Sequence, residues 1–246
     1  MTTKAFNCKR MNEVKRGDRI IILYGETGTG KSTFINAVAG CDAAKVDHTL
    51  KGSANRIEVF KITGPDLKPF VLVEAPGVDT SNNDSSKLGL WLHDQKNPPV
   101  AGVIYLRRIT DNRMSNAQIN TLDSLSTICG IDAASHIFVL TTMWDVPATA
   151  RQIEREREFK TDFCSIKAAL GECKLLRMEN TKKQTTREIT RAARQTVQEV
   201  LDRDPCRLLV GRQMRDSKGD YRGTAVGKVE EKSKGFRGFF RGLFSK

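Results

Sequence analysis

One run of nine residues brings together the residue types that bind a phosphate group. It fits the pattern Gly-x-x-x-x-Gly-Lys-Ser/Thr, and its residues are Gly25, Glu26, Thr27, Gly28, Thr29, Gly30, Lys31, Ser32 and Thr33. Glycines let successive backbone N–H groups turn inward, and a helix N-terminus adds the positive end of a dipole. Lys31 is expected to act catalytically on the β- and γ-phosphates, and the Ser32 hydroxyl to ligate Mg²⁺. We therefore predict that this loop binds a nucleotide.

A strand and a helix are predicted on the two sides of the loop, where they would hold it in place. The apolar run 19–24 is typical of a buried parallel strand. Residues 34–39 predict a helix that ends at Gly40. Strands and helices alternate over most of the chain, which favours an α/β fold with a mostly parallel sheet and helices on both faces.

Six strands are predicted in this sheet. After the first strand, further strands are expected at 55–62, 70–74, 102–106, 137–141 and 173–178, and helices at 86–95, 116–129, 150–170 and 187–202. The turn signal Gly64-Pro65-Asp66 joins two of these strands into a predicted hairpin, which would supply one antiparallel edge.

An acidic residue at the end of a predicted strand is a candidate for the metal site. Glu74 is followed by Ala75, Pro76 and Gly77, about forty residues after the phosphate-binding loop. An acid in this position can hold a Mg²⁺-bound water, and the Gly77 N–H can meet the γ-phosphate. An ordinary strand that ends in a Pro-Gly turn is the alternative interpretation.

A second strand end carries the residues expected to recognise a base. Thr142, Met143, Trp144 and Asp145 follow the strand predicted at 137–141. The Asp145 carboxylate can accept hydrogen bonds from guanine N1 and N2, which adenine cannot supply. The usual pattern is Asn or Thr, then Lys, any residue and Asp, so Met143 replaces the lysine. Met143 or Trp144 is expected to cover the base instead.

Residues 20 to about 200 resemble the fungal G-domain proteins related to immune-associated GTPases and septins. The resemblance includes the phosphate-binding loop and the segments 74–77, 102–114 and 141–145, as well as the region after Pro205. It implies a Ras-like P-loop fold, binding of GTP or GDP with Mg²⁺, and GTPase activity. For this chain we expect nucleotide-dependent switch segments at about 41–53 and 78–94, and a homodimer through that face.

Several positions depart from the pattern that this resemblance implies. The acid is Glu74 in place of aspartate, and Val78 stands where Ras-like enzymes use a glutamine to orient water. The expected switch threonine corresponds to Ala54, with Ser53 or Thr49 as alternatives. We therefore predict slow hydrolysis. A non-hydrolysing scaffold and, because of Met143, an ATP-using P-loop enzyme are the alternative interpretations.

Charged residues are unevenly distributed along the 246 residues, whose net charge is +12. Residues 203–246 contain twelve Lys and Arg against five Asp and Glu. We predict a polar N-terminal arm at 1–18, a G domain at 19–203 and a basic C-terminal extension at 204–246. Arg107, Arg108 and Arg113 are candidates for an arginine finger, within one chain or across a dimer.

The last twelve residues, 235–246, interleave phenylalanines with cations. This pattern favours peripheral contact with a membrane surface, and docking onto the G domain or a disordered basic tail are alternatives. Nucleic acid is a less favoured partner, because no RNA-binding signature is present. The six cysteines are scattered without a Cys-x-x-Cys pair, and no secretory signal precedes the domain, so reduced thiols and a cytoplasmic location are expected.

Overall fold

A seven-stranded sheet forms the centre of the computed structural model, which describes residues 6–46, 56–64, 68–77, 84–145, 147–164, 170–179 and 185–228. The strand order is β1-β3-β4-β2-β5-β6-β7. The strands are β1 (Asn7–Met11), β2 (Arg19–Tyr24), β3 (Glu58–Thr63), β4 (Phe70–Glu74), β5 (Gly102–Arg108), β6 (Ile137–Thr142) and β7 (Lys174–Arg177). The predicted Ras-like α/β fold is confirmed.

The prediction of six strands is wrong by one, because residues 7–11 of the predicted arm form β1. This strand runs antiparallel to β3, from Asn7 opposite Thr63 to Met11 opposite Val59. None of its residues is fully buried, so it lacks the apolar alternation that predicts a strand. Backbone pairing and an ion pair between Arg10 and Glu58 hold it at the edge of the sheet.

Parallel pairing dominates the rest of the sheet and brings the strand ends together. β2 pairs in parallel with β4 and β5, β5 with β6, and β6 with β7. The predicted hairpin of β3 and β4 is present and antiparallel. Because parallel strands end at the same edge, the loops after β2, β4, β5 and β6 meet there, as ligand-binding loops do in open α/β sheets.

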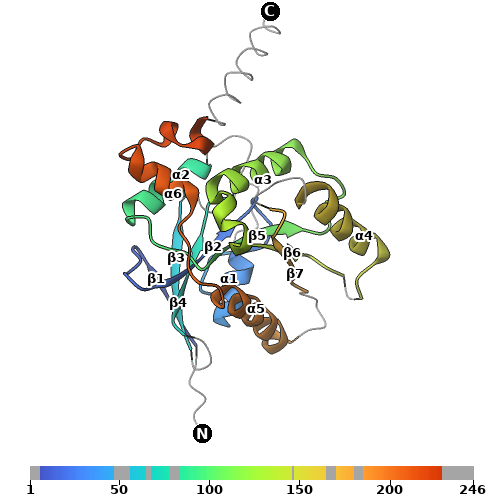
Figure 1. Cartoon of the computed structure of the whole chain (residues 1–246). Helices are drawn as coiled ribbons and strands as arrows, with labels where there is room; N and C mark the ends of the chain where they lie inside the picture. The colour runs from blue at the N-terminus through green and yellow to red at the C-terminus, as the bar shows by residue number, and fades with distance from the viewer. Residues whose placement is uncertain are drawn as a thin grey trace, which may run out of the picture.

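Helices cover both faces of the sheet (Figure 1). The helices are α1 (Lys31–Ala39), α2 (Asp84–Asp94), α3 (Asn116–Cys129), α4 (Ala150–Glu158), α5 (Thr186–Leu201) and α6 (Leu209–Asp216). α1 contacts α5 on one face, whereas α2, α3 and α6 contact one another on the other face (Figure 1). A π-helical turn at Phe159–Cys164 continues α4, so the helix predicted at 150–170 changes its winding before its expected end.

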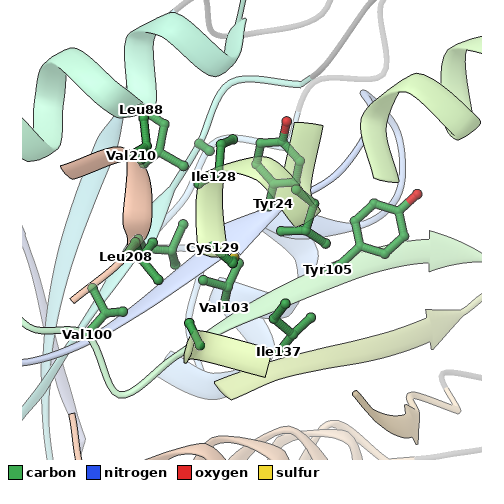
Figure 2. Packing of buried hydrophobic residues seen from close by; sticks show 14 of the residues in the cluster. Tyr24, Leu88, Val100, Val103, Tyr105, Ile128, Cys129, Ile137, Leu208 and Val210 are labelled. Carbon is green, nitrogen blue, oxygen red and sulfur yellow. The ribbon is translucent and has the colours of Figure 1, made fainter. Parts of the chain in front are cut away.

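Two hydrophobic clusters explain why the sheet needs helices on both sides. Successive β2 residues alternate between them: Ile20 and Ile22 join the cluster under α2, α3 and α6, while Ile21 and Leu23 join the cluster under α1 and α5. All four side chains are completely buried. Figure 2 shows the first cluster, in which Val103 of β5 lies among residues from α2, α3 and α6.

The first part of the predicted C-terminal extension packs onto the G domain. The backbone of Cys206 forms an isolated antiparallel β-bridge with that of Val100. Leu208, Val210 and Met214 are fully buried against α2 and α3. The division into arm, G domain and extension stays a prediction, and the tail at 235–246 lies outside the described residues. Within the described ranges, no helix has the length and apolar character needed to cross a membrane. All six cysteines are free thiols.

Candidate nucleotide-binding site

Glycine determines the shape of the loop between β2 and α1. Gly25, Gly28 and Gly30 have φ values of 142°, 78° and 95°, a region that L side chains rarely adopt. Gly25 also lies against β5, because a Cβ there would come within 2.5 Å of the Leu106 carbonyl oxygen. Both glycines that the motif requires, Gly25 and Gly30, therefore have backbone conformations that favour glycine, and so does Gly28 at a position that the motif leaves open.

The N-terminus of α1 has no side-chain cap, in contrast to three other helices. Ser115, Thr149 and Thr185 cap α3, α4 and α5 through reciprocal capping boxes. Gly30 precedes α1 and provides no side-chain cap. The first backbone N–H groups of a helix have no intrahelical acceptor, so those of α1 are suited to bind an anion.

The Lys31 side chain lies against the backbone of the same loop. Its Nζ donates hydrogen bonds to the carbonyl oxygens of Gly25 and Glu26, each at 2.9 Å, and the residue is buried. Thr29 is also buried, and its hydroxyl donates to the Glu26 carbonyl at 2.9 Å. These bonds hold the ammonium group at the loop, where phosphate recognition needs a positive charge.

Ser32 and Glu74 meet at the start of α1. The Ser32 hydroxyl donates to Glu74 Oε1 at 2.8 Å, so the longer side chain of glutamate spans the distance from β4. Burial raises the pKa of Glu74, although the hydrogen bond from Ser32 and the charge of Lys31 oppose this shift. Neighbouring Thr33 is half-buried in the first turn of α1.

This pair of oxygen donors fits Mg²⁺. Mg²⁺ is usually held by one or two carboxylates together with the phosphates of a substrate. Within the part of the chain that the structure describes, no cluster of three or more His, Cys, Asp or Glu is suited to hold a metal alone. Ser32 and Glu74 would therefore hold the ion together with phosphate oxygens.

Gly77 packs directly on the phosphate-binding loop. A Cβ at this position would lie 2.1 Å from Thr27 Oγ1 and 2.8 Å from the Thr27 backbone nitrogen. Only glycine fits this contact, which joins the segment after β4 to the loop after β2. Val78, Thr49, Ser53 and Ala54 lie outside the described residues, so their predictions remain predictions.

The end of β6 is joined to the phosphate-binding loop through Thr142. This buried residue donates from its hydroxyl to the Thr29 carbonyl at 3.0 Å. Asp145 follows with an exposed side chain, and its backbone N–H donates to Gln152 Oε1 at 3.3 Å. The structure therefore connects Thr142 with the loop and leaves the Asp145 carboxylate accessible.

Trp144 cannot cover a bound base, which corrects one of the two predicted covers. Its indole is buried and donates to the Thr141 carbonyl at 3.2 Å, and the Arg177 guanidinium lies 4.4 Å from its ring. Met143 is 44% exposed and has a left-handed φ of 61°. Met143 is therefore the candidate that remains.

The three candidate arginines have different surroundings. Arg107 is buried, and its guanidinium lies 4.6 Å from the centre of the Phe159 ring. It is therefore no longer a candidate for an arginine finger. Arg113 is exposed on the loop after β5. Arg108, at the end of β5, packs against the phosphate-binding loop, and its Nη2 is 3.8 Å from Glu26 Oε2. Sequence patterns indicate none of these differences, because they depend on contacts with residues distant in the sequence, such as Phe159 and Glu26.

A family comparison agrees with this arrangement of loop, helix and strand ends. The model described as 50S ribosome-binding GTPase matches residues 20–210. The chain belongs to this GTPase family. It is accordingly a G-domain protein of a guanine-nucleotide-binding family, and the matched residues include the loop, Glu74, Gly77 and Asp145. A sequence search against curated proteins gave no match.

Solved structures similar to this GTPase-family chain include Toc33 from Arabidopsis thaliana. Toc33 in complex with GDP and Mg²⁺ has a TM-score of 0.58 at 11% identity, over 78% of this chain and 88% of that chain. Toc33 in complex with Mg²⁺ and GMPPNP has a TM-score of 0.56 at 12% identity, over 78% and 89%. At such identities the likeness concerns the fold.

Proposed function

We propose that this protein binds GTP with Mg²⁺ and hydrolyses it slowly to GDP and phosphate as a nucleotide-dependent switch. The observation that carries the proposal is the convergence of Lys31, Ser32 and Glu74 at the uncapped start of α1. Backbone N–H groups of the loop and Lys31 would bind the phosphates, and Asp145 would read guanine. Water would be the nucleophile.

Each part of the site has a distinct task in this proposal. Mg²⁺ held by Ser32 and Glu74 would neutralise charge on the phosphates. Gly77, in contact with Thr27, would present its N–H to the γ-phosphate, and this contact would link nucleotide state to the segment that follows β4. Slow turnover is inferred from Val78, which cannot orient a water molecule as glutamine does.

Single-turnover hydrolysis with protein in excess over GTP tests the proposal. We expect phosphate release that is slow but faster than in buffer, and that depends on Mg²⁺. Tight GTP binding without release above the buffer rate would instead support a non-hydrolysing scaffold, which the residues Val78 and Ala54 favour. Equal displacement of labelled GTP by ATP would contradict guanine specificity.

A homodimer through the switch face is part of the same proposal. Dimerisation is important for the GTPase activity of the chloroplast translocon components atToc33 and psToc159, and a solved structure from that system has a fold similar to this chain. For this chain we expect the hydrolysis rate per molecule to rise with protein concentration. A rate that is constant over a hundred-fold range of concentration would argue against a dimer.

We further propose a cytoplasmic protein with peripheral membrane contact through residues 235–246. The basis is sequence alone: aromatic residues alternate with cations in this tail. The segment 102–114 similarly supports a relationship to the fungal G-domain proteins near immune-associated GTPases and septins. Co-sedimentation with anionic vesicles should fall when residues 235–246 are deleted, and unchanged pelleting would dismiss membrane contact.

Glu74→Gln is expected to separate stability from metal-dependent binding. Because burial raises the pKa of Glu74, the folded chain binds a proton at this carboxyl more tightly than the unfolded chain does. The resulting contribution to the stability of the folded state is complete at pH values below the pKa of this group in the unfolded chain. That contribution is lost as the pH rises through the folded-state pKa. At neutral pH and without ligand, the glutamine variant should therefore be at least as stable as the original, while Mg²⁺-dependent GTP affinity falls.

Urea unfolding between about pH 4 and 8, with and without GTP and Mg²⁺, measures both effects. Exposed Glu158 provides the matched control, since Glu158→Gln removes the same charge from α4. A glutamine variant with unchanged Mg²⁺ dependence would remove Glu74 from the metal site.

A further inference from the structure

The base-recognition segment lacks the cation that its sequence pattern normally contains. Met143 occupies the position of the usual lysine, directly after Thr142, which is tied to the phosphate-binding loop. The Met143 side chain is exposed and can supply apolar contact, but it carries neither charge nor a donor group. A cation at this edge of the site would therefore come from another element.

Arg108 provides a cation from the neighbouring strand. In the parallel pairing of β5 and β6, Arg108 stands opposite Thr142, one residue before Met143. Its Nη1 lies 3.5 Å from where a Cβ on Gly28 would be, and its Nη2 lies 3.8 Å from Glu26 Oε2. The guanidinium therefore contacts the phosphate-binding loop at the same edge of the sheet.

A polar network holds the other side of this guanidinium. Arg108 Nε donates to both carboxylate oxygens of Asp111, at 3.0 and 3.3 Å. Asp111 Oδ2 also accepts a hydrogen bond from Gln118 Nε2 at 2.6 Å, and Gln118 belongs to the capping box that Ser115 forms at the start of α3. Asp111 is thereby fixed to a helix end and in turn orients Arg108.

The outer nitrogens of Arg108 remain available for a ligand. Neither Nη1 nor Nη2 donates a hydrogen bond to any residue within the described ranges, and the side chain is 32% exposed. The 3.8 Å ion pair with Glu26 is too long for a hydrogen bond. A planar fork with two such nitrogens matches the geometry of phosphate oxygens.

We propose that Arg108 binds the phosphates of the nucleoside di- or triphosphate and supplies the cation that Met143 cannot. The inference rests on the proposed function, because it assumes that a nucleotide occupies this loop. The ligand is a polyphosphate. Arg108 binds its negative charge together with Lys31, which lies at the other end of the loop sequence. Arg108 acts within one chain and needs no dimer.

Fluorescence titration of GTP, GDP and GMP with the full chain tests this assignment. Arg108→Ala should raise Kd for GTP and GDP at least ten-fold and for GMP much less. It should also weaken the salt dependence of Kd, since one phosphate contact is lost. Arg157→Ala removes an exposed arginine of α4 that pairs with Glu154, and should change each Kd less than two-fold. Arg108→Lys keeps the charge and should give an intermediate Kd.

A rescue variant tests the exchange between the two positions. Adding Met143→Lys to Arg108→Ala should recover at least five-fold in GTP affinity, whereas Met143→Lys alone should have a smaller effect. A Kd in Arg108→Ala equal to that of Arg157→Ala, with both variants folded by thermal unfolding, would overturn the proposal. If Met143→Lys restored no GTP affinity to Arg108→Ala, the idea that a cation at position 143 can replace Arg108 would be wrong. If the unaltered protein bound no GTP, the proposed function itself would fall.

Discussion

Lys31→Ala should raise Kd for GTP by about a hundred-fold or more. Lys31 is the buried cation of the loop, and its ammonium already lies within hydrogen-bond distance of two loop carbonyls. A hydrogen bond to a charged group contributes about 1.5–3 kcal/mol, and two such bonds to phosphate oxygens correspond to about 3–6 kcal/mol. The loss should be similar for GDP, because in the proposed function the loop would bind the phosphates of both nucleotides.

Equilibrium titration with a fluorescent GTP analogue measures this effect. Lys174→Ala is the matched control, because Lys174 is an exposed lysine that pairs with Glu199 on the surface. Thermal unfolding without ligand should show that Lys31→Ala remains folded, since the core under α1 consists of other residues. A Kd for Lys31→Ala within three-fold of the control would contradict phosphate binding by this loop.

The phosphate-binding loop and the central strands could be predicted from the sequence because local residues determine them. Gly25 and Gly30 adopt backbone conformations that favour glycine, so the motif and the fold impose the same requirement at these two positions. β2 is buried on both faces, and such strands appear in a sequence as continuous apolar runs. The helix predicted at 116–129 matches α3, which a capping box begins.

The elements that escaped prediction depend on contacts between distant residues. β1 has exposed and half-buried side chains only, and its position is determined by pairing with β3. The burial of Trp144 follows from its contacts with Thr141 and Arg177. The place of Arg108 follows from the register of β5 against β6. None of these contacts leaves a periodic signal in the sequence.

The proposed function has two parts that depend on different residues. In the proposed function, phosphate and metal binding would involve Lys31, Ser32 and Glu74, which the structure brings together. Sensing and hydrolysis of the γ-phosphate would depend additionally on residues near Ala54 and Val78, which depart from the pattern of Ras-like enzymes. Affinity and turnover should therefore respond to different substitutions, so binding should be measured separately from phosphate release.

Asp145→Asn should change the preferred base from guanine to xanthine. In the proposed function, the aspartate carboxylate would accept hydrogen bonds from guanine N1–H and from the 2-amino group. An asparagine amide opposes one of these donors with its own N–H, which instead suits the C2 carbonyl oxygen of xanthine. Loss of a charge-assisted hydrogen bond with an unpaired donor costs about 2–4 kcal/mol, so Kd for GTP should rise about thirty-fold or more.

Competition titrations with GTP, XTP and ATP distinguish this change from general damage. The backbone of Asp145 is held by Gln152, which also caps α4 with Thr149, and asparagine retains that backbone contact. Asp162→Asn removes an exposed carboxylate from the π-helical turn and should leave all three affinities unchanged. Asp145→Asn with an undiminished preference for GTP would assign guanine recognition to another residue. If the unaltered protein bound GTP and ATP with equal affinity, the site would have no base specificity. The accessible carboxylate of Asp145 would then contact no base, in agreement with the replacement of the usual lysine by Met143.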